Sequence, residues 1–233
     1  MTLVLRKTQF AFRMLRRFGF ARTSNCVLCK LLYAALRIPF RFDAWHASAP
    51  YACREYKHRV AAAANSIAPR VVVDIGCGLA EVLDHIRAPF RYGIDLDPGA
   101  IAAAQFLRGR RISLHVASAL EPELIAQAVT ERPVDLLIMT NWIHGFTTEQ
   151  LVGMIEGLAA ALDVKYLLVD FVRNNTLAAC HCHRLEDVAA LGEVVLSRDA
   201  GDDVRDLHLL KLHSRTAAAA PRTLVTSSRG IDA

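Results

Sequence analysis

The chain has 233 residues, of which 53% are hydrophobic, and a formal net charge of +5. This length and composition predict one globular α/β domain with an appendage and argue against a disordered chain. No apolar run could span a bilayer, and no signal-peptide cleavage pattern is clear. The six cysteines follow no framework, so we expect a reducing, cytoplasmic setting, in contact at most with the inner membrane face.

The positive charge is concentrated in an N-terminal arm. Residues 1–42 carry nine Lys/Arg and no acidic residue, which leaves the remainder of the chain at −4. Bulky apolar side chains interleave with these bases. This pattern predicts either an amphipathic helix on an anionic membrane surface or a helical cap on the body of the protein. An organelle transit peptide and, less naturally, a nucleic-acid-binding arm are the alternatives.

Residues 71–82, with the sequence VVVDIGCGLAEV, predict a buried parallel strand, a tight turn and the start of a helix. Gly76 and Gly78 permit backbone angles closed to other residues and let a ligand lie against the main chain. The first βα turn of an open α/β sheet is where nucleotide-like cofactors bind. Glu81 stands where a dinucleotide fingerprint needs a third glycine, and no Gly-Lys-Ser/Thr follows, so NAD, FAD and a Walker loop are disfavoured.

The D-x-G-x-G pattern of Asp74, Gly76 and Gly78 resembles motif I of the class I S-adenosylmethionine-dependent methyltransferases. Ala80 stands where that family usually has a third glycine. The resemblance implies a Rossmann-like, doubly wound α/β fold with seven strands, mostly parallel, with an antiparallel strand from a C-terminal hairpin. It also implies S-adenosylmethionine as cofactor, and we assign Cys77, between the two glycines, to the same cofactor site.

Residues 90–97 predict the second strand and its end. Asp95 lies 21 residues beyond the acid of the first strand, near the spacing at which an acidic strand end binds ribose hydroxyls. The resemblance points to Asp95 as the ribose ligand, with Leu96 beside it. Asp97 is expected to cap the next helix, with Pro98 at its first position.

Residues 112–116 and 134–140 predict the third and fourth strands. After the third strand, Ser118 stands where the family often has an aspartate that accepts from the adenine amino group. After the fourth strand, Asn141 lies in the segment that flanks the methionine part of the cofactor in this family.

The same segment faces the methyl acceptor in the family. Methyl transfer is an in-line displacement, and an alcohol acceptor must also lose its proton, a task that suits a histidine titrating near neutral pH. We therefore expect His144 to be the catalytic base and Trp142 to be an apolar wall or stacking face. The alternative is that His144 caps a helix or bonds a neighbouring loop. Beyond the fifth strand, predicted at 165–172, His181 and His183 could bind substrate hydroxyls or lie in solvent.

Residues 42–56 are dense in aromatic and polar groups, and Trp45 and His46 are candidate substrate-binding residues. This stretch resembles methyltransferases encoded beside bacterial surface-polysaccharide genes; a packed linker is the alternative. We expect methyl transfer to a hydroxyl of a sugar or glycan precursor. The other hypotheses are a different small-molecule acceptor, or a non-catalytic, membrane-associated scaffold with a degenerate cofactor pocket.

Residues 192–198 and 205–212 predict the C-terminal hairpin, which a standard dinucleotide-binding domain lacks. The expected organisation is therefore an arm over 1–42, a methyltransferase domain over 43–213 and a loose tail over 214–233.

A zinc site is the less favoured interpretation of the cysteines. Cys26-x-x-Cys29 could pair with a distant cluster, Cys180, His181, Cys182 and His183, but that cluster is irregular, and two buried cysteines in an apolar helix are the simpler explanation. No carboxylate cluster of the kind that holds Mg²⁺ beside an acceptor is evident, so we expect no metal.

Overall fold

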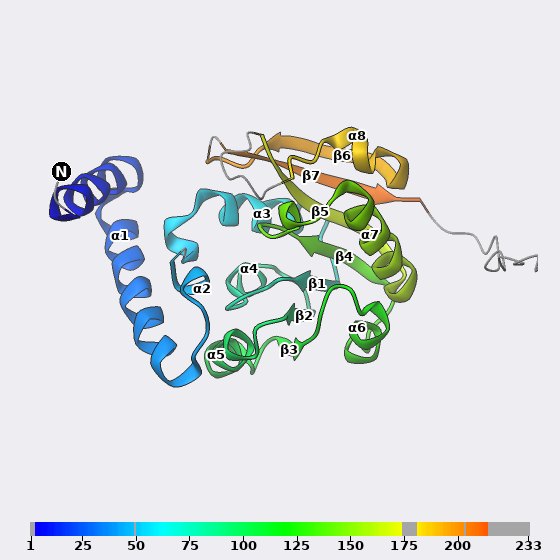
Figure 1. Ribbon diagram of the computed structural model, residues 1–233, viewed down its shortest axis with the longest axis horizontal. Helices are drawn as coiled ribbons and strands as arrows, with labels where there is room; N and C mark the ends of the chain where they lie inside the picture. The colour runs from blue at the N-terminus through cyan, green and yellow to red at the C-terminus, as the bar shows by residue number, and fades with distance from the viewer. Residues whose placement is uncertain (1–2, 49, 174–180, 203, 214–233) are drawn as a thin grey trace, which may run out of the picture.

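The computed structural model describes residues 3–48, 50–173, 181–202 and 204–213 (Figure 1). Seven strands form one sheet in the order β3-β2-β1-β4-β5-β7-β6. Five of them run parallel: β1 (Val71–Ile75), β2 (Phe90–Asp95), β3 (Ser113–Val116), β4 (Val134–Met139) and β5 (Val164–Val172). The last two form the hairpin, in which β7 (Arg205–Leu212) runs antiparallel to both β5 and β6 (Gly192–Asp199). The predicted fold and all seven predicted strands are confirmed.

Helices cover both faces of this sheet (Figure 1). One face packs against α6 (Pro122–Ala128), α7 (Thr148–Leu162) and α8 (Leu185–Val188), and the other packs against α3 (Glu55–Ser66), α4 (Glu81–Asp84) and α5 (Pro98–Arg108). Because β1 lies between two helical layers, all five of its residues are buried, which explains its continuous run of apolar residues. The described residues also form four short helices: α2 (Ala44–Ser48) and the 3-10 helices η1 (Tyr51–Cys53), η2 (Ile143–Gly145) and η3 (Ala189–Leu191).

The start of α5 follows its sequence signals. The Asp97 carboxylate accepts hydrogen bonds from the amides of Gly99 and Ala100 at 2.8 and 3.1 Å, and Pro98 occupies the first helical position. The predicted cap is confirmed, and it fixes the loop that leaves β2 at the edge of the sheet where the strands end.

The N-terminal helix α1 (Leu3–Phe40) consists of two parts, because the helical geometry is interrupted at Gly19 with φ 75° and ψ 173°. The first part (dark blue) lies at an angle to the second in Figure 1. The second part packs on the body, where Tyr33 and Leu36 are buried with Phe42 and the alanines of α5. The Tyr33 hydroxyl donates to Glu81 at 2.7 Å, which ties α1 to the first turn of α4. No described helix combines the length and the apolar composition that crossing a bilayer would require.

Cys26 of α1 forms a disulfide with Cys53 of η1, with the two Cα atoms 5.2 Å apart. The expectation that the cysteines are unpaired is therefore wrong for these two. Their 27-residue separation along the chain carried no signal of the pairing, which the packing of α1 against η1 creates. Cys26 is consequently not available as a zinc ligand. Cys180, from the second proposed ligand cluster, and the predicted tail over 214–233 lie outside the described residues.

Candidate cofactor and acceptor site

A cavity of about 370 Å³ opens at the carboxyl ends of β1, β2 and β4. Its volume is within the range of small-molecule sites. All eight residues expected at the cofactor line it: Asp74, Gly76, Cys77, Gly78, Asp95, Leu96, Ser118 and Asn141. Three of the five residues expected at the substrate line it as well: Trp45, His46 and Trp142. The other two, His181 and His183, and the expected base His144 are not among its lining residues.

The turn after β1 is built around backbone donors. The amides of Gly76 and Cys77 both donate to the carbonyl of Ile94, at 2.8 and 3.0 Å. Gly76 and Gly78 have φ values of 73° and 53°, which favour glycine. The side chain of His46 also packs closely against the turn, since a Cβ on Gly78 would lie 2.8 Å from Nδ1 of His46.

Trp142 lies directly over the other glycine. A Cβ on Gly76 would overlap the indole ring, and Nε1 of Trp142 donates to the carbonyl of Ile75 at 2.6 Å. Phe146 meets the indole edge-on, with ring centroids 5.7 Å apart, and lines the cavity too. The two rings therefore form an apolar wall beside the glycine turn.

Asp95 is a buried carboxylate at the end of β2. Its Oδ2 accepts from the amide of Gly78 at 2.7 Å and its Oδ1 from the amide of Asp97 at 2.9 Å. These bonds hold the carboxylate at the wall of the cavity. Asp74 lies nearby at the end of β1, where burial and the neighbouring Asp95 raise its pKa to about 8. The Asp74 side chain is consequently protonated at neutral pH.

Carboxyl groups outnumber amino groups in the cavity lining. Asp43, Glu81 and Asp95 are acidic, Asp74 is a fourth carboxyl group that is protonated and so adds no charge, and Lys57 is the basic counterpart. Nζ of Lys57 lies 2.6 Å from Oε2 of Glu81, so its charge is already matched. Burial pushes the pKa of Glu81 up, but the Lys57 ammonium and hydrogen bonds from Tyr51 and Tyr33 outweigh burial and lower it. Such a lining is unfavourable for a phosphate group and favourable for a cation.

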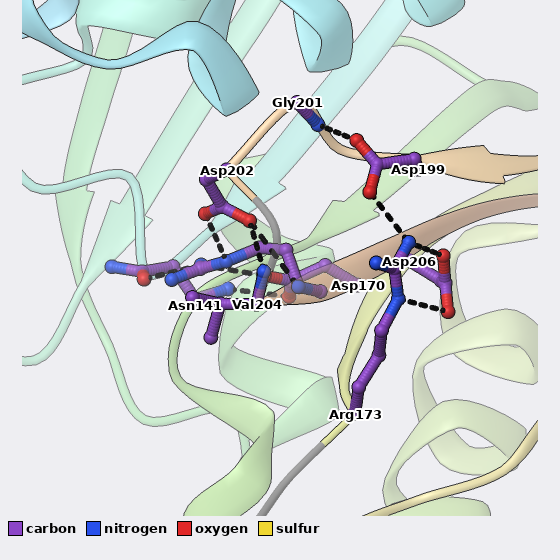
Figure 2. Close-up of polar contacts among 9 residues, drawn as sticks. Asn141, Asp170, Arg173, Asp199, Gly201, Asp202, Val204 and Asp206 are labelled. Carbon is purple, nitrogen blue, oxygen red and sulfur yellow. Dashed lines mark hydrogen bonds and ion pairs between the residues drawn. The ribbon is translucent and has the colours of Figure 1, made fainter.

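Asp170 and Arg205, which the sequence analysis missed, hold the end of β4 in place. Figure 2 shows Asp170 beside Asn141. The amide of Asn141 donates to Oδ1 of Asp170 at 2.6 Å, and Nη1 of Arg205 donates to both Oδ1 of Asn141 and Oδ2 of Asp170, at 2.7 and 2.8 Å. Asn141 is thereby kept at φ 73°. The signal for Asp170 was a single acid inside the apolar strand Val164–Val172; Arg205 gave none.

The three candidate histidines meet beside η2. The amide of His181 donates to the carbonyl of His144 at 2.7 Å, and Nε2 of the buried His183 lies 3.2 Å from the carbonyl of Ile143. His183 also lies near Phe171, with ring centroids 5.9 Å apart. Nδ1 of His144 is buried without a hydrogen-bond partner among the described residues, and burial lowers the pKa of this side chain.

Beside the cavity, the described residues include one group with metal-ligand chemistry. Asp43, His46 and Asp97 place potential ligand atoms within 4.8 Å of one another, and Nε2 of His46 lies 3.6 Å from Oδ2 of Asp97. Asp97 already uses its other oxygen to cap α5. These contacts account for the cluster as a structural link between the α1–α2 segment and α5.

No protein-family model and no curated protein sequence matches the chain. Solved structures do. The N-methyltransferase NodS from Bradyrhizobium japonicum WM9, in complex with S-adenosyl-L-homocysteine, is 17% identical over 77% of this chain and 97% of that chain, with a TM-score of 0.59. Magnesium protoporphyrin IX methyltransferase (ChlM) from Synechocystis PCC 6803, also with S-adenosylhomocysteine, is 12% identical over 86% of this chain and 97% of that chain, with a TM-score of 0.54.

The methyltransferase domain of bacterial CtHen1-C is 15% identical over 68% of this chain and 97% of that chain, with a TM-score of 0.53. At such identities a structural likeness shows the fold and not the substrate. The chain has the Rossmann-like fold of the class I S-adenosylmethionine-dependent methyltransferases.

Proposed function

We propose that the chain is a methyltransferase that uses S-adenosylmethionine. The observation that carries the proposal is the charge of the cavity at the glycine turn, where carboxyl groups outnumber amino groups and Lys57 is neutralised by Glu81. S-adenosylmethionine is a nucleoside with a sulfonium cation and no phosphate, so it fits this lining, whereas the pyrophosphate of NAD or FAD would be repelled. Asp95 would hold the ribose hydroxyls, and the glycine turn would lie against the cofactor.

The residues at the end of β4 would face the reacting methyl group. Asn141, held by Asp170 and Arg205, and the indole of Trp142 would limit the space in which an acceptor can approach. The chain's contribution to such a displacement is to hold the acceptor atom and the methyl group close and collinear.

For the acceptor we propose a hydroxyl group of a sugar or glycan precursor, with His144 as the general base. The support for the base is the lowered pKa of His144, which favours a neutral ring that can accept a proton, and its place on η2, between the cavity-lining residues Trp142 and Phe146. His144 does not itself line the cavity, so the proposal requires its ring to turn toward the acceptor. The support for the sugar is the sequence resemblance over residues 42–56. His144→Gln is expected to lower kcat with little change in KM for the acceptor, and to remove the acid limb of the pH–rate profile.

Calorimetric titration of the purified chain with S-adenosylmethionine tests the cofactor. We expect micromolar binding by the wild type and at least about tenfold weaker binding by Asp95→Asn, since a hydrogen bond to a charged group contributes about 1.5–3 kcal/mol. Asp135→Asn is the matched control. Asp135 bonds Arg70, Val71 and Lys165 at the opposite end of the sheet, so its loss is expected to leave the affinity within about twofold.

A well-folded wild type that binds no S-adenosylmethionine, or that binds NAD as tightly, would contradict the proposal. Release of S-adenosylhomocysteine separates an enzyme from a scaffold with a degenerate pocket. A scaffold would bind the cofactor and yield no product with sugar, nucleotide-sugar or other small-molecule hydroxyl acceptors.

A further inference from the structure

The second part of α1, residues 20–40, has two unlike faces. The inner face is buried against the body and includes Cys26, Tyr33 and Leu36. The outer face is apolar and exposed: Phe20 and Ile38 are 78% and 81% exposed, Leu28 and Leu31 are both 64% exposed, and Val27 and Leu32 are exposed as well. These positions recur at helical spacing, so they form one continuous stripe on the side of α1 that faces away from the sheet.

A stripe of this kind on a soluble protein marks an interaction surface, because isolated exposed apolar residues are common but contiguous ones are not. Charge identifies the partner. Residues 1–42 carry nine Lys/Arg and no acidic residue. On the helix, Lys30 and Arg37 fall between the inner and outer faces and so border the stripe on one side. The charged residues beside the apolar stripe are thus all basic. Such a surface suits an anionic lipid bilayer, where the apolar side chains enter the headgroup region and the bases meet the phosphates.

We propose that the outer face of residues 20–40 docks on an anionic lipid surface, with its apolar side chains in the headgroup region and its bases on the lipid phosphates. Neither half of the interaction suffices alone, since a few exposed apolar side chains and a few bases each give weak binding. Together they predict binding that depends both on anionic lipid and on the apolar stripe.

The helix would carry the rest of the molecule with it. The Cys26–Cys53 disulfide, the hydrogen bond from Tyr33 to Glu81 and the ion pair between Arg22 and Glu55 at 3.1 Å join its inner face to η1, α4 and α3. Glu81 itself lines the cavity. A docked α1 would therefore hold the cavity in a fixed relation to the bilayer.

Vesicle sedimentation with the full chain tests the proposal. We compare phosphatidylcholine vesicles with vesicles that also contain phosphatidylglycerol, at low salt and at about 0.5 M salt, where screening shortens the reach of charges to a few Å. We expect binding to the anionic vesicles at low salt and at least about tenfold weaker binding at high salt.

Two double variants separate the stripe from exposed apolar residues in general. Leu28→Ser with Leu31→Ser is expected to weaken binding to anionic vesicles at least about tenfold, because two apolar side chains no longer enter the lipid. Leu124→Ser with Val195→Ser changes two residues that are 48% and 50% exposed on α6 and β6, and it is expected to bind as the wild type does. Since all four positions are exposed, circular dichroism should show folded protein in each case.

Several outcomes would overturn the proposal: no sedimentation with either vesicle, equal binding to neutral vesicles, or full binding by the Leu28/Leu31 variant. Binding to duplex DNA at the same low salt without binding to vesicles would assign the bases to nucleic acid. A dimer that the Leu28/Leu31 variant loses, again without vesicle binding, would assign the stripe to a second copy of the chain. Cofactor titration needs no vesicles, so the two proposals fail separately.

Discussion

Asp74 combines three properties at the residue scale: it is the penultimate residue of β1, it is buried, and its pKa is raised to about 8 by burial and by Asp95. A carboxyl group with a folded-state pKa above its unfolded value of 3.8 favours folding less as it ionises. Its contribution is fully present below about pH 4 and is lost as the pH rises through about 8.

Asp74→Asn should remove this dependence. Relative to the variant, the wild type is expected to lose free energy of unfolding between about pH 4 and pH 8, by up to about 1.4 kcal/mol per pH unit. Urea unfolding at a series of pH values measures it. Asp135→Asn is the control, because it removes a carboxylate whose pKa is lowered. The difference in free energy of unfolding between this variant and the wild type should be constant above about pH 5. If the free energy of unfolding of the wild type and of Asp74→Asn changed with pH in the same way, the raised pKa of Asp74 would be contradicted.

At the scale of elements, Arg205 joins β7 to the ends of β4 and β5. Its guanidinium reaches Asn141, Asp170 and Asp202 and lies 4.4 Å from the centre of the Tyr56 ring. Arg205→Ala leaves the buried Asp170 without its cation, so we expect a loss of about 3–5 kcal/mol in the free energy of unfolding. Arg205→Lys keeps the charge without the planar fork and should lose less.

Arg173→Ala is the matched control, also drawn in Figure 2. Arg173 pairs with two carboxylates as well, Asp199 and Asp206, but in an exposed network that water and salt screen. Urea unfolding should show a far smaller effect than for Arg205→Ala, and only the Arg205 variants should weaken S-adenosylmethionine binding. Equal losses in stability for the two alanine variants would contradict the special role of the buried pair.

The strands were predictable because each one is a short apolar run with a turn signal after it. The β-branched run at 71–73, the acid at Asp95 and the cap at Asp97 are local features, and local features were sufficient to place the glycine turn and the strand ends in order. The network around Asn141 was not predictable in this way. It joins residues 64 and 35 positions apart, and only the antiparallel pairing of β7 with β5 brings Arg205 to that site.

The orientation of the histidine side chains was likewise not predictable from the sequence. His144, His181 and His183 do meet, but at η2 and outside the lining of the cavity, because the buried imidazole of His183 packs near Phe171 and the carbonyl of Ile143. Sequence position alone could place the three near the end of β4 and not decide which way their rings point.

At the scale of the whole molecule, the Cys26–Cys53 disulfide closes a loop that includes the contact of α1 with the body. Thiol titration of the unfolded, unreduced chain should find two fewer thiols than the reduced chain. Reduction is expected to lower the free energy of unfolding by about 3.5 kcal/mol, from the chain entropy of a loop of this length. Cys29→Ser, which removes a free thiol, should leave the effect of reduction unchanged. A full thiol count before reduction would contradict the pairing.

The chain contains two tryptophans, and both line the cavity: Trp45 is largely exposed at its edge, and Trp142 lies over the glycine turn with its Nε1 bonded to Ile75. The intrinsic indole emission of the whole protein therefore originates at the site itself. Because Trp45 is exposed and Trp142 is partly buried, we expect Trp45 to supply a red-shifted, quencher-accessible component and Trp142 a more shielded one. A ligand that occupies the cavity is therefore expected to change the tryptophan fluorescence spectrum of the protein, so binding can be followed without a label.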